Sequence, residues 1–141
     1  MPEENSGPSA CHLAELLRTC RTPPDVLQVE LHPMWSYCKL RRVCAESDVY
    51  FQAFSSLGQG ALVQKPEVVA VAEACRRTPA QVLLRWALQQ GVGVLPSSRD
   101  ITRVQENGCV FDFELSLQHV QRLSALDCGR RVCRRDPSCV T

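Results

Sequence analysis

Hydroxyl, acidic and basic side chains are concentrated in residues 95–107, LPSSRDITRVQEN, in an order that suits the binding of an anion. An apolar run ends at Pro96, two serines follow, and Asp100 can cap a helix whose first turn holds Arg103. The backbone N–H groups at such a helix start attract a phosphate, and a guanidinium can bind it through two hydrogen bonds. A capped surface helix with a solvated arginine has the same residues, so this segment alone leaves both interpretations open.

A second polar loop, residues 55–60 with the sequence SSLGQG, follows an apolar run at residues 49–54. In a (β/α)8 barrel, the loops after the last two strands commonly build a phosphate site. Residues 55–60 and 97–100 would be those two loops if the apolar runs before them are the last two strands. The two loops therefore favour a phosphate site within a barrel.

The elements that must position these loops alternate between strand and helix. Strands are expected at residues 26–31, 49–54 and 92–95, and helices at residues 13–20 and 36–45, then from Pro66, after a Thr78 cap with Pro79 and Gln81, after Asp100 and after Ser116. The inward side chains are expected to be Val68, Val71, Ala72, Cys75, Val82, Leu83, Trp86, Ala87, Leu117, Val120, Leu123 and Leu126. This order predicts an α/β fold that forms part of a (β/α)8 TIM barrel, and no Gly-x-Gly-x-x-Gly motif supports a dinucleotide-binding doubly wound sheet.

Composition excludes several classes of function. The chain has 141 residues, a net charge of +1 and no apolar run long enough to span a membrane, so neither nucleic acid nor a membrane is an expected partner. Its acidic, polar start lacks the pattern of a secretory signal, which favours a cytoplasmic location. Nine cysteines without a Cys-x-x-Cys motif predict reduced thiols, and three scattered histidines predict no metal site.

Five segments, taken in order, resemble the aldo-keto reductase family. They are QVELHP at 28–33, AFSSLG at 53–58, TPAQVLLRW at 78–86, LPSS at 95–98 and VFDFELS at 110–116. The resemblance covers only the C-terminal half of a family barrel, strands six to eight with their helices. It implies a loose segment at residues 1–11, a half-barrel at residues 12–127 and a tail at residues 128–141.

The resemblance also implies contacts with NADP(H). Gln28 matches the residue that holds the nicotinamide carboxamide, and Phe54 matches the aromatic residue that stacks on the nicotinamide ring. The pyrophosphate would lie against Ser55, Leu57 and Gly58, and the adenosine 2′-phosphate end against Ser98, Arg103, Glu106 and Asn107. Ser97 stands where the family usually has lysine, and Arg99 offers a replacement charge, so the preference for NADP over NAD stays open. Weak or vestigial NADP binding is expected.

No catalytic residue is expected in this chain. The family's catalytic Asp, Tyr, Lys and His belong to the N-terminal half of the barrel, and the roles expected for His32, Tyr37 and Lys39 are not catalytic. One hypothesis is therefore a truncated aldo-keto reductase, related to enzymes that reduce aldehydes and ketones with NADPH but inactive alone. The others are a catalytically silent nucleotide- or partner-binding module and a non-enzymatic interaction protein.

Three strands of an eight-stranded barrel leave two open sheet edges and an uncovered inner face. The side chains expected to lack part of their packing are Val26, Val29, Val49, Phe51, Val92 and Val94. Self-association, or pairing with a complementary half-barrel, is the expected consequence.

Overall fold

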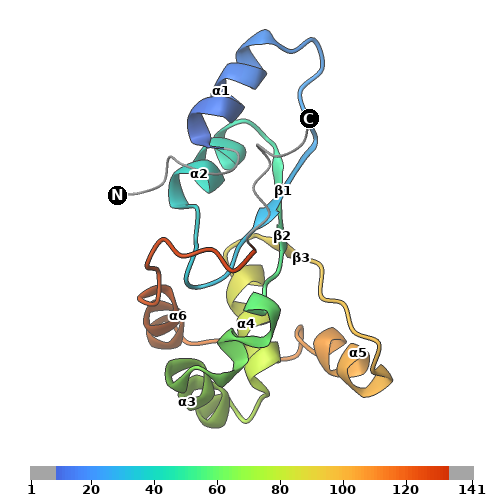
Figure 1. Cartoon of the computed structure of the whole chain (residues 1–141), viewed down its shortest axis with the longest axis vertical. Coiled ribbons are helices and arrows are strands. Elements are labelled where there is room, and N and C mark those ends of the chain that lie inside the picture. The colour runs from blue at the N-terminus through green and yellow to red at the C-terminus, as the bar shows by residue number, and fades with distance from the viewer. Residues whose placement is uncertain (1–8, 134–141) are drawn as a thin grey trace.

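The structure, a computed structural model that describes residues 9–133, alternates strands with helices as predicted (Figure 1). The elements are α1 (Ala10–Thr19), β1 (Val26–Glu30), α2 (Cys38–Glu46), β2 (Tyr50–Phe54), α3 (Pro66–Cys75), α4 (Pro79–Leu88), β3 (Gly93–Val94), α5 (Ile101–Gly108) and α6 (Leu117–Ser124). Two short 3-10 turns, Gly58–Gly60 and Leu62–Gln64, connect β2 to α3. The predicted α/β fold is confirmed.

The three strands form one parallel sheet in the order β1-β2-β3. Glu30 at the end of β1 lies beside Phe54 at the end of β2, and Gln52 lies beside Gly93. Strand β3 is shorter than the predicted range of 92–95. The backbone N–H of Val92 donates to the carbonyl oxygen of Ala87 in α4, and Pro96 has no N–H to extend the ladder.

The two faces of the sheet have different environments. Val29, Phe51 and Val92 are buried on the outer face, where α2 packs on β2 and α4 packs on β3. The prediction that these three residues and Val49 would lack packing is therefore wrong. Successive residues of a strand point to opposite faces, and the helices cover every second position, including these.

The opposite face of the sheet, which we call the inner face, is exposed. Val26 is 49% exposed, Tyr50 is 52% exposed and Leu95, just beyond β3, is 46% exposed. Gln28 and Gln52 lie between them on the same face, joined by a 2.9 Å hydrogen bond from Nε2 of Gln28 to Oε1 of Gln52. One face of the sheet is thus exposed, as expected, but only these alternate side chains lie on it.

The predicted N-caps of three helices are confirmed. The Thr78 hydroxyl accepts from the N–H of Gln81, which completes a capping box, and Asp100 and Ser116 cap α5 and α6. Helix α1 begins three residues before its predicted start because Ser9 and His12 form a further capping box.

One predicted inward side chain, Leu117, is wrong. It is 73% exposed, whereas Leu123 on the same helix is fully buried. Six residues at 100° per residue separate the two by about 120° around the helix, so both cannot face the core. Leu117 also occupies the first position of α6.

The eight cysteines within the described residues are free thiols, and Cys139 lies outside them. No group of histidine, cysteine, aspartate and glutamate suited to a metal ion occurs among residues 9–133. In that same range, no helix combines the length and hydropathy that a membrane crossing requires.

Candidate functional site

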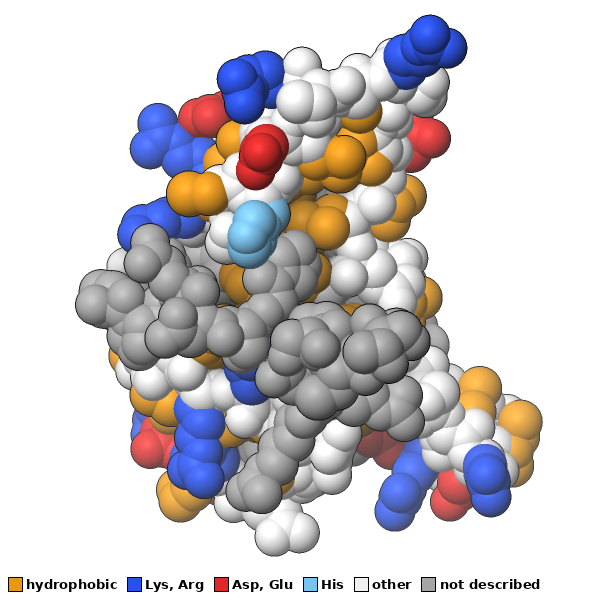
Figure 2. All heavy atoms as spheres, turned by 45° about the horizontal axis from the view of Figure 1, so that its top comes forward, with side chains coloured by type: hydrophobic (Ala, Val, Ile, Leu, Met, Phe, Trp, Pro, Cys, Tyr) orange, Lys and Arg blue, Asp and Glu red, His pale blue; other side chains and the backbone are white. Residues whose placement is uncertain are grey.

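Both predicted anion-binding loops lie at the carboxyl-terminal edge of the sheet. Because the strands are parallel, residues 55–60 after β2 and residues 95–100 after β3 leave the sheet at the same edge. Helix α5 then projects from the body of the fold, and none of its side chains is buried (Figure 1). Charged and hydrophobic side chains are both visible on this projection, at the lower right of Figure 2.

A pocket of about 360 Å³ lies between α5, the start of α4 and the loop after β2. It brings together six of the predicted site residues: Leu57, Ser97, Ser98, Arg103, Glu106 and Asn107. Gly60, Val63, Thr78, Pro79 and Ala80 complete its lining. Arg99 is not among the lining residues, so the structure does not place its charge in this pocket.

The polar groups of this pocket are partly fixed and partly available. Glu106 accepts a 2.5 Å hydrogen bond from the Thr78 hydroxyl, and its backbone carbonyl accepts from the Gln81 side chain. Asp100 caps α5 by accepting from the N–H of Thr102, and its own N–H donates to the Ser98 hydroxyl. The Arg103 side chain makes no hydrogen bond or ion pair with any other described residue. Its guanidinium is therefore available to an anion.

The turn after β2 requires unusual backbone angles. Ser55 has a φ of 54° and Gly58 a φ of 58°, both in the left-handed region. A Cβ atom on Gly58 would lie 2.8 Å from the Leu62 side chain, so glycine is needed here for space as well as for conformation.

A second pocket, of about 320 Å³, lies where β1 and β2 end. Its lining consists of Glu30, Phe54, Gln59, Arg131 and Cys133. Of the predicted site residues, Phe54 lies in this pocket. Gln28 lies on the inner face of the sheet, where its amide is bonded to Gln52.

Glu30 organises this second pocket and was missed by the sequence analysis. It is 1% exposed and accepts hydrogen bonds from the backbone N–H groups of Val132 and Cys133, and its Oε1 lies 3.0 Å from His32 Nε2. Burial alone raises the pKa of a carboxyl group, but these contacts outweigh it and hold the pKa of Glu30 below its ordinary value. The available signal was an acidic residue inside the apolar run VLQVEL.

The side chain of His32 is fully buried against Glu30. This position fits the structural role expected from the sequence. Tyr37 is likewise engaged, since its hydroxyl lies 2.9 Å from an Arg131 nitrogen that donates to it.

We expect the free energy of unfolding of the wild type to rise between about pH 3 and pH 6, and we expect Glu30→Gln to reduce this rise. Because the folded-state pKa is lowered, ionised Glu30 stabilises the fold above its unfolded-state pKa, and this stabilisation is lost as the pH falls through the folded-state value. Urea denaturation across this range measures it, with Glu15→Gln on the exposed side of α1 as the control. Parallel profiles for the wild type and both variants would contradict the assignment.

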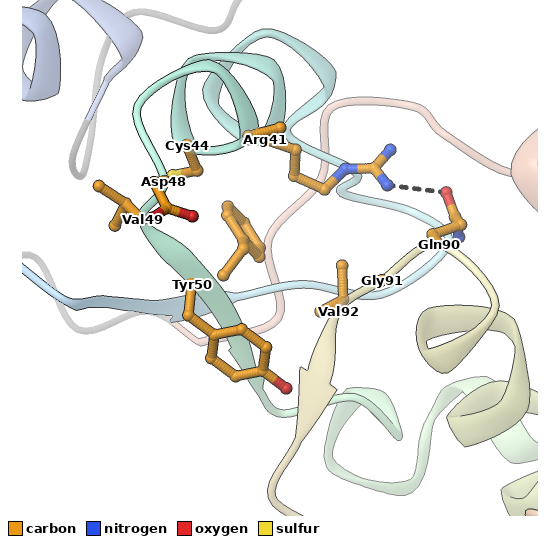
Figure 3. Close-up of a pocket in the computed structure, with 10 residues that line it drawn as sticks. Arg41, Cys44, Asp48, Val49, Tyr50, Gln90, Gly91 and Val92 are labelled. Carbon is orange, nitrogen blue, oxygen red and sulfur yellow. Dashed lines mark hydrogen bonds between the residues drawn. The ribbon is translucent and has the colours of Figure 1, made fainter.

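A third pocket, of about 250 Å³, lies at the opposite, amino-terminal end of the strands (Figure 3). Arg41 of α2 reaches across it and donates a 2.8 Å hydrogen bond to Gln90, which follows α4. None of the predicted site residues lines this pocket. The candidate site is therefore at the carboxyl-terminal edge.

Comparison with known proteins gives one consistent result. A sequence model described as the Aldo/keto reductase family matches residues 5–127. An aldo-keto reductase of Mycolicibacterium vanbaalenii is 43% identical over 132 residues, which are 94% of this chain and 47% of that protein. A glyoxal reductase of Bacillus subtilis is 40% identical over 121 residues, which are 86% of this chain and 44% of that protein.

Solved structures agree with the sequence relatives. The aldose reductase from Schistosoma japonicum superposes with a TM-score of 0.81 and 34% identity, over 87% of this chain and 40% of that one. The structure of Gox0644 in its apo form superposes with a TM-score of 0.81 and 33% sequence identity, over 86% of this chain and 46% of that one. This chain thus spans about half the length of the relatives it matches.

Proposed function

Because this chain belongs to the aldo/keto reductase family, we propose that it binds NADP(H) weakly through the pocket beside α5. The observation that carries the proposal is the convergence of Ser97, Ser98, Arg103, Glu106 and Asn107 on that one pocket. Its volume of about 360 Å³ is within the range of small-molecule sites. The pocket receives the adenosine end of the nucleotide.

Each polar group has a role in this proposal. Arg103, which has no ion pair within residues 9–133, binds the 2′-phosphate together with the Ser98 hydroxyl. The Glu106 carboxylate, held by Thr78, accepts a hydrogen bond from the adenine amino group. Asn107 contributes an amide that can both donate and accept.

The rest of the cofactor would follow the carboxyl-terminal edge of the sheet. In this arrangement β1, β2 and β3 are strands six to eight of a family barrel. The pyrophosphate lies against Ser55, Leu57 and Gly58, and the nicotinamide lies near Phe54 and Gln28. The chain acts as a nucleotide-binding part of an aldo-keto reductase without carbonyl-reducing activity of its own.

Arg103→Ala is expected to weaken NADP+ binding by about 1.5–3 kcal/mol, because a hydrogen bond between charged groups is lost. Quenching of Trp86 and Trp35 fluorescence on titration provides the measurement. Arg122→Ala, which removes an exposed arginine from α6, is the matched control and should leave the affinity unchanged. Equal affinities for wild type and Arg103→Ala, or no saturation up to millimolar NADP+, would refute the site.

A second function, partner binding, is favoured by the inner face of the sheet. Val26, Tyr50 and Leu95 are about half exposed there, and the outer strands β1 and β3 each have only one described neighbour in the sheet. We propose that this face pairs with a complementary half-barrel or with a second copy of the chain. The pocket proposed for the adenosine end lies at the edge of the sheet and not on this face, so a partner bound to the face would leave that pocket open.

A further inference from the structure

A fourth pocket, of about 480 Å³, is lined by basic residues. It lies between the connection from β2 to α3, which contributes Lys65, and the segment after α6, which contributes Arg130 and Arg131. No aspartate or glutamate of residues 9–133 is part of its lining. Two segments that are far apart in the sequence therefore bring three cations to one cavity.

Two of these three positive charges are not neutralised within the described part of the chain. Arg131 comes within 3.8 Å of Glu30 and donates to the Tyr37 hydroxyl, so an acid already offsets its charge. The side chains of Lys65 and Arg130, by contrast, make no hydrogen bond or ion pair within residues 9–133. Lys65 is also half-buried, and an ion pair at such a position is screened less than one on an open surface.

The start of α3 adds to the positive potential of this pocket. Lys65 is the N-cap residue of α3, and no side chain caps the helix. An acidic or hydroxyl side chain is usual at this position, because the N-terminus of a helix carries a partial positive charge and a cation there is unfavourable. Glu67 lies in the first turn but does not line the pocket. An anion bound in the pocket would offset the repulsion between Lys65 and the helix.

The other lining residues suit the uncharged part of a small ligand. Met34 and Val132 provide apolar surface, and the Gln64 amide can both donate and accept hydrogen bonds. The N–H groups of Cys128 and Arg130 lie 3.3 and 3.2 Å from the carbonyl oxygen of Met34, which holds two walls of the pocket together. A volume of about 480 Å³ is within the range of small-molecule sites and leaves room for an organic group beside an anionic one.

We propose that this pocket binds a small phosphate monoester, with the phosphate between Lys65 and Arg130 and the organic group against the apolar wall. A phosphate monoester carries a charge of about −1.5 to −2 at pH 7, which matches the two cations that lack an acidic partner. A single carboxylate would neutralise only one of them. Arginine can bind two phosphate oxygens at once, and lysine supplies a point charge.

This site is separate from the proposed nucleotide site. The residues assigned to the pyrophosphate, Ser55, Leu57 and Gly58, do not line it, and neither do the residues of α5. The inference therefore goes beyond the proposed function and does not depend on it. A chain that binds no NADP+ could still bind the phosphate ester, and the reverse also holds.

The test is calorimetry on the full chain with glycerol 3-phosphate as the probe and with glycerol and succinate as ligands that lack phosphate. We expect saturable binding of glycerol 3-phosphate in the millimolar range, no binding of glycerol and weaker binding of succinate, whose two charges lie on separate groups. Lys65→Ala and Arg130→Ala each remove one cation. Each should weaken the binding of glycerol 3-phosphate about tenfold, as for the loss of one charge-assisted hydrogen bond.

Arg122→Ala, which removes an exposed arginine from α6, is the matched control and should leave the affinity unchanged. Circular dichroism checks folding, and the exposed position of Arg130 keeps its substitution away from the core. Unchanged affinity in either folded variant, no saturation with the wild type, or equally tight binding of succinate would overturn the proposal. A larger loss in Arg103→Ala than in Lys65→Ala would overturn it too, because the phosphate would then lie in the pocket beside α5.

Discussion

No NADPH-dependent reduction of simple aldehydes is expected from this chain assayed alone. Hydride transfer to a carbonyl needs a positioned proton donor at the carbonyl oxygen, and losing such a donor typically costs about 10² to 10⁴ in rate. In the pocket beside Phe54 the carboxyl group is Glu30, whose lowered pKa and bound N–H groups keep it ionised. Tyr37 is engaged with Arg131, and Tyr50 lies on the inner face of the sheet over Gly93.

The assay follows NADPH absorbance with glyoxal as substrate, because one matched relative is named a glyoxal reductase. Phe54→Ala separates intrinsic activity from contamination, since it removes the ring proposed to stack on nicotinamide. Turnover that persists in Phe54→Ala would come from a contaminant and leave the expectation intact. Steady turnover by the wild type that Phe54→Ala abolishes would show that the chain carries its own catalytic machinery.

The pocket beside α5 could be predicted because its signals are local. Thr78, Asp100 and Ser116 each predict a helix start from residues three or four positions apart. The two polar loops are recognised because each directly follows an apolar run. The resemblance then supplied the pairing of these distant loops in one site. What the pattern did not indicate was Thr78 as a partner of Glu106, because the two are 28 residues apart and Thr78 already serves as a cap.

The attachment of residues 128–133 to Glu30 could not be predicted for a related reason. The backbone N–H of Val132 donates to Glu30 across 102 residues, and no periodic pattern encodes such a contact. From the sequence, residues 128–141 are rich in arginine and cysteine, and the family resemblance suggests only that they are a remnant of a C-terminal lid. A buried acid at the end of a strand needs partners, so Glu30 was the one local sign that a distant segment must cover it.

The faces of the sheet show a different failure, because the information was present in the sequence. Strand residues alternate between faces, and Val29 and Phe51 are out of phase with Val26 and Tyr50. Grouping all the valines as barrel interior ignored that period. The wrong prediction that Leu117 faces the core has the same origin, because the helical period of 3.6 residues places Leu117 and Leu123 on different sides of α6.

The wild-type chain is expected to self-associate through the inner face of the sheet at micromolar concentrations. Val26, Tyr50 and Leu95 expose apolar surface on a parallel sheet, an arrangement normally covered on both faces. Full burial of an exposed apolar side chain typically contributes about 1.5–3 kcal/mol, and about half of that is left for each of these half-exposed side chains. In a dimer both copies contribute, so their burial favours association. The unpaired backbone of the outer strands adds a template for strand pairing.

Tyr50→Lys tests this assignment, because it places a charge at the centre of the exposed face, and we expect it to weaken association at least about tenfold. Phe111→Lys is the matched control, since Phe111 is 76% exposed in the loop before α6 and away from the sheet. Sedimentation over a concentration series, combined with thermal unfolding, gives both the oligomeric state and the stability. If the wild type is a monodisperse monomer that unfolds sharply above roughly 55 °C, as intact domains commonly do, then three strands suffice and the inner face needs no partner. Equal weakening by Phe111→Lys would place the contact on another surface.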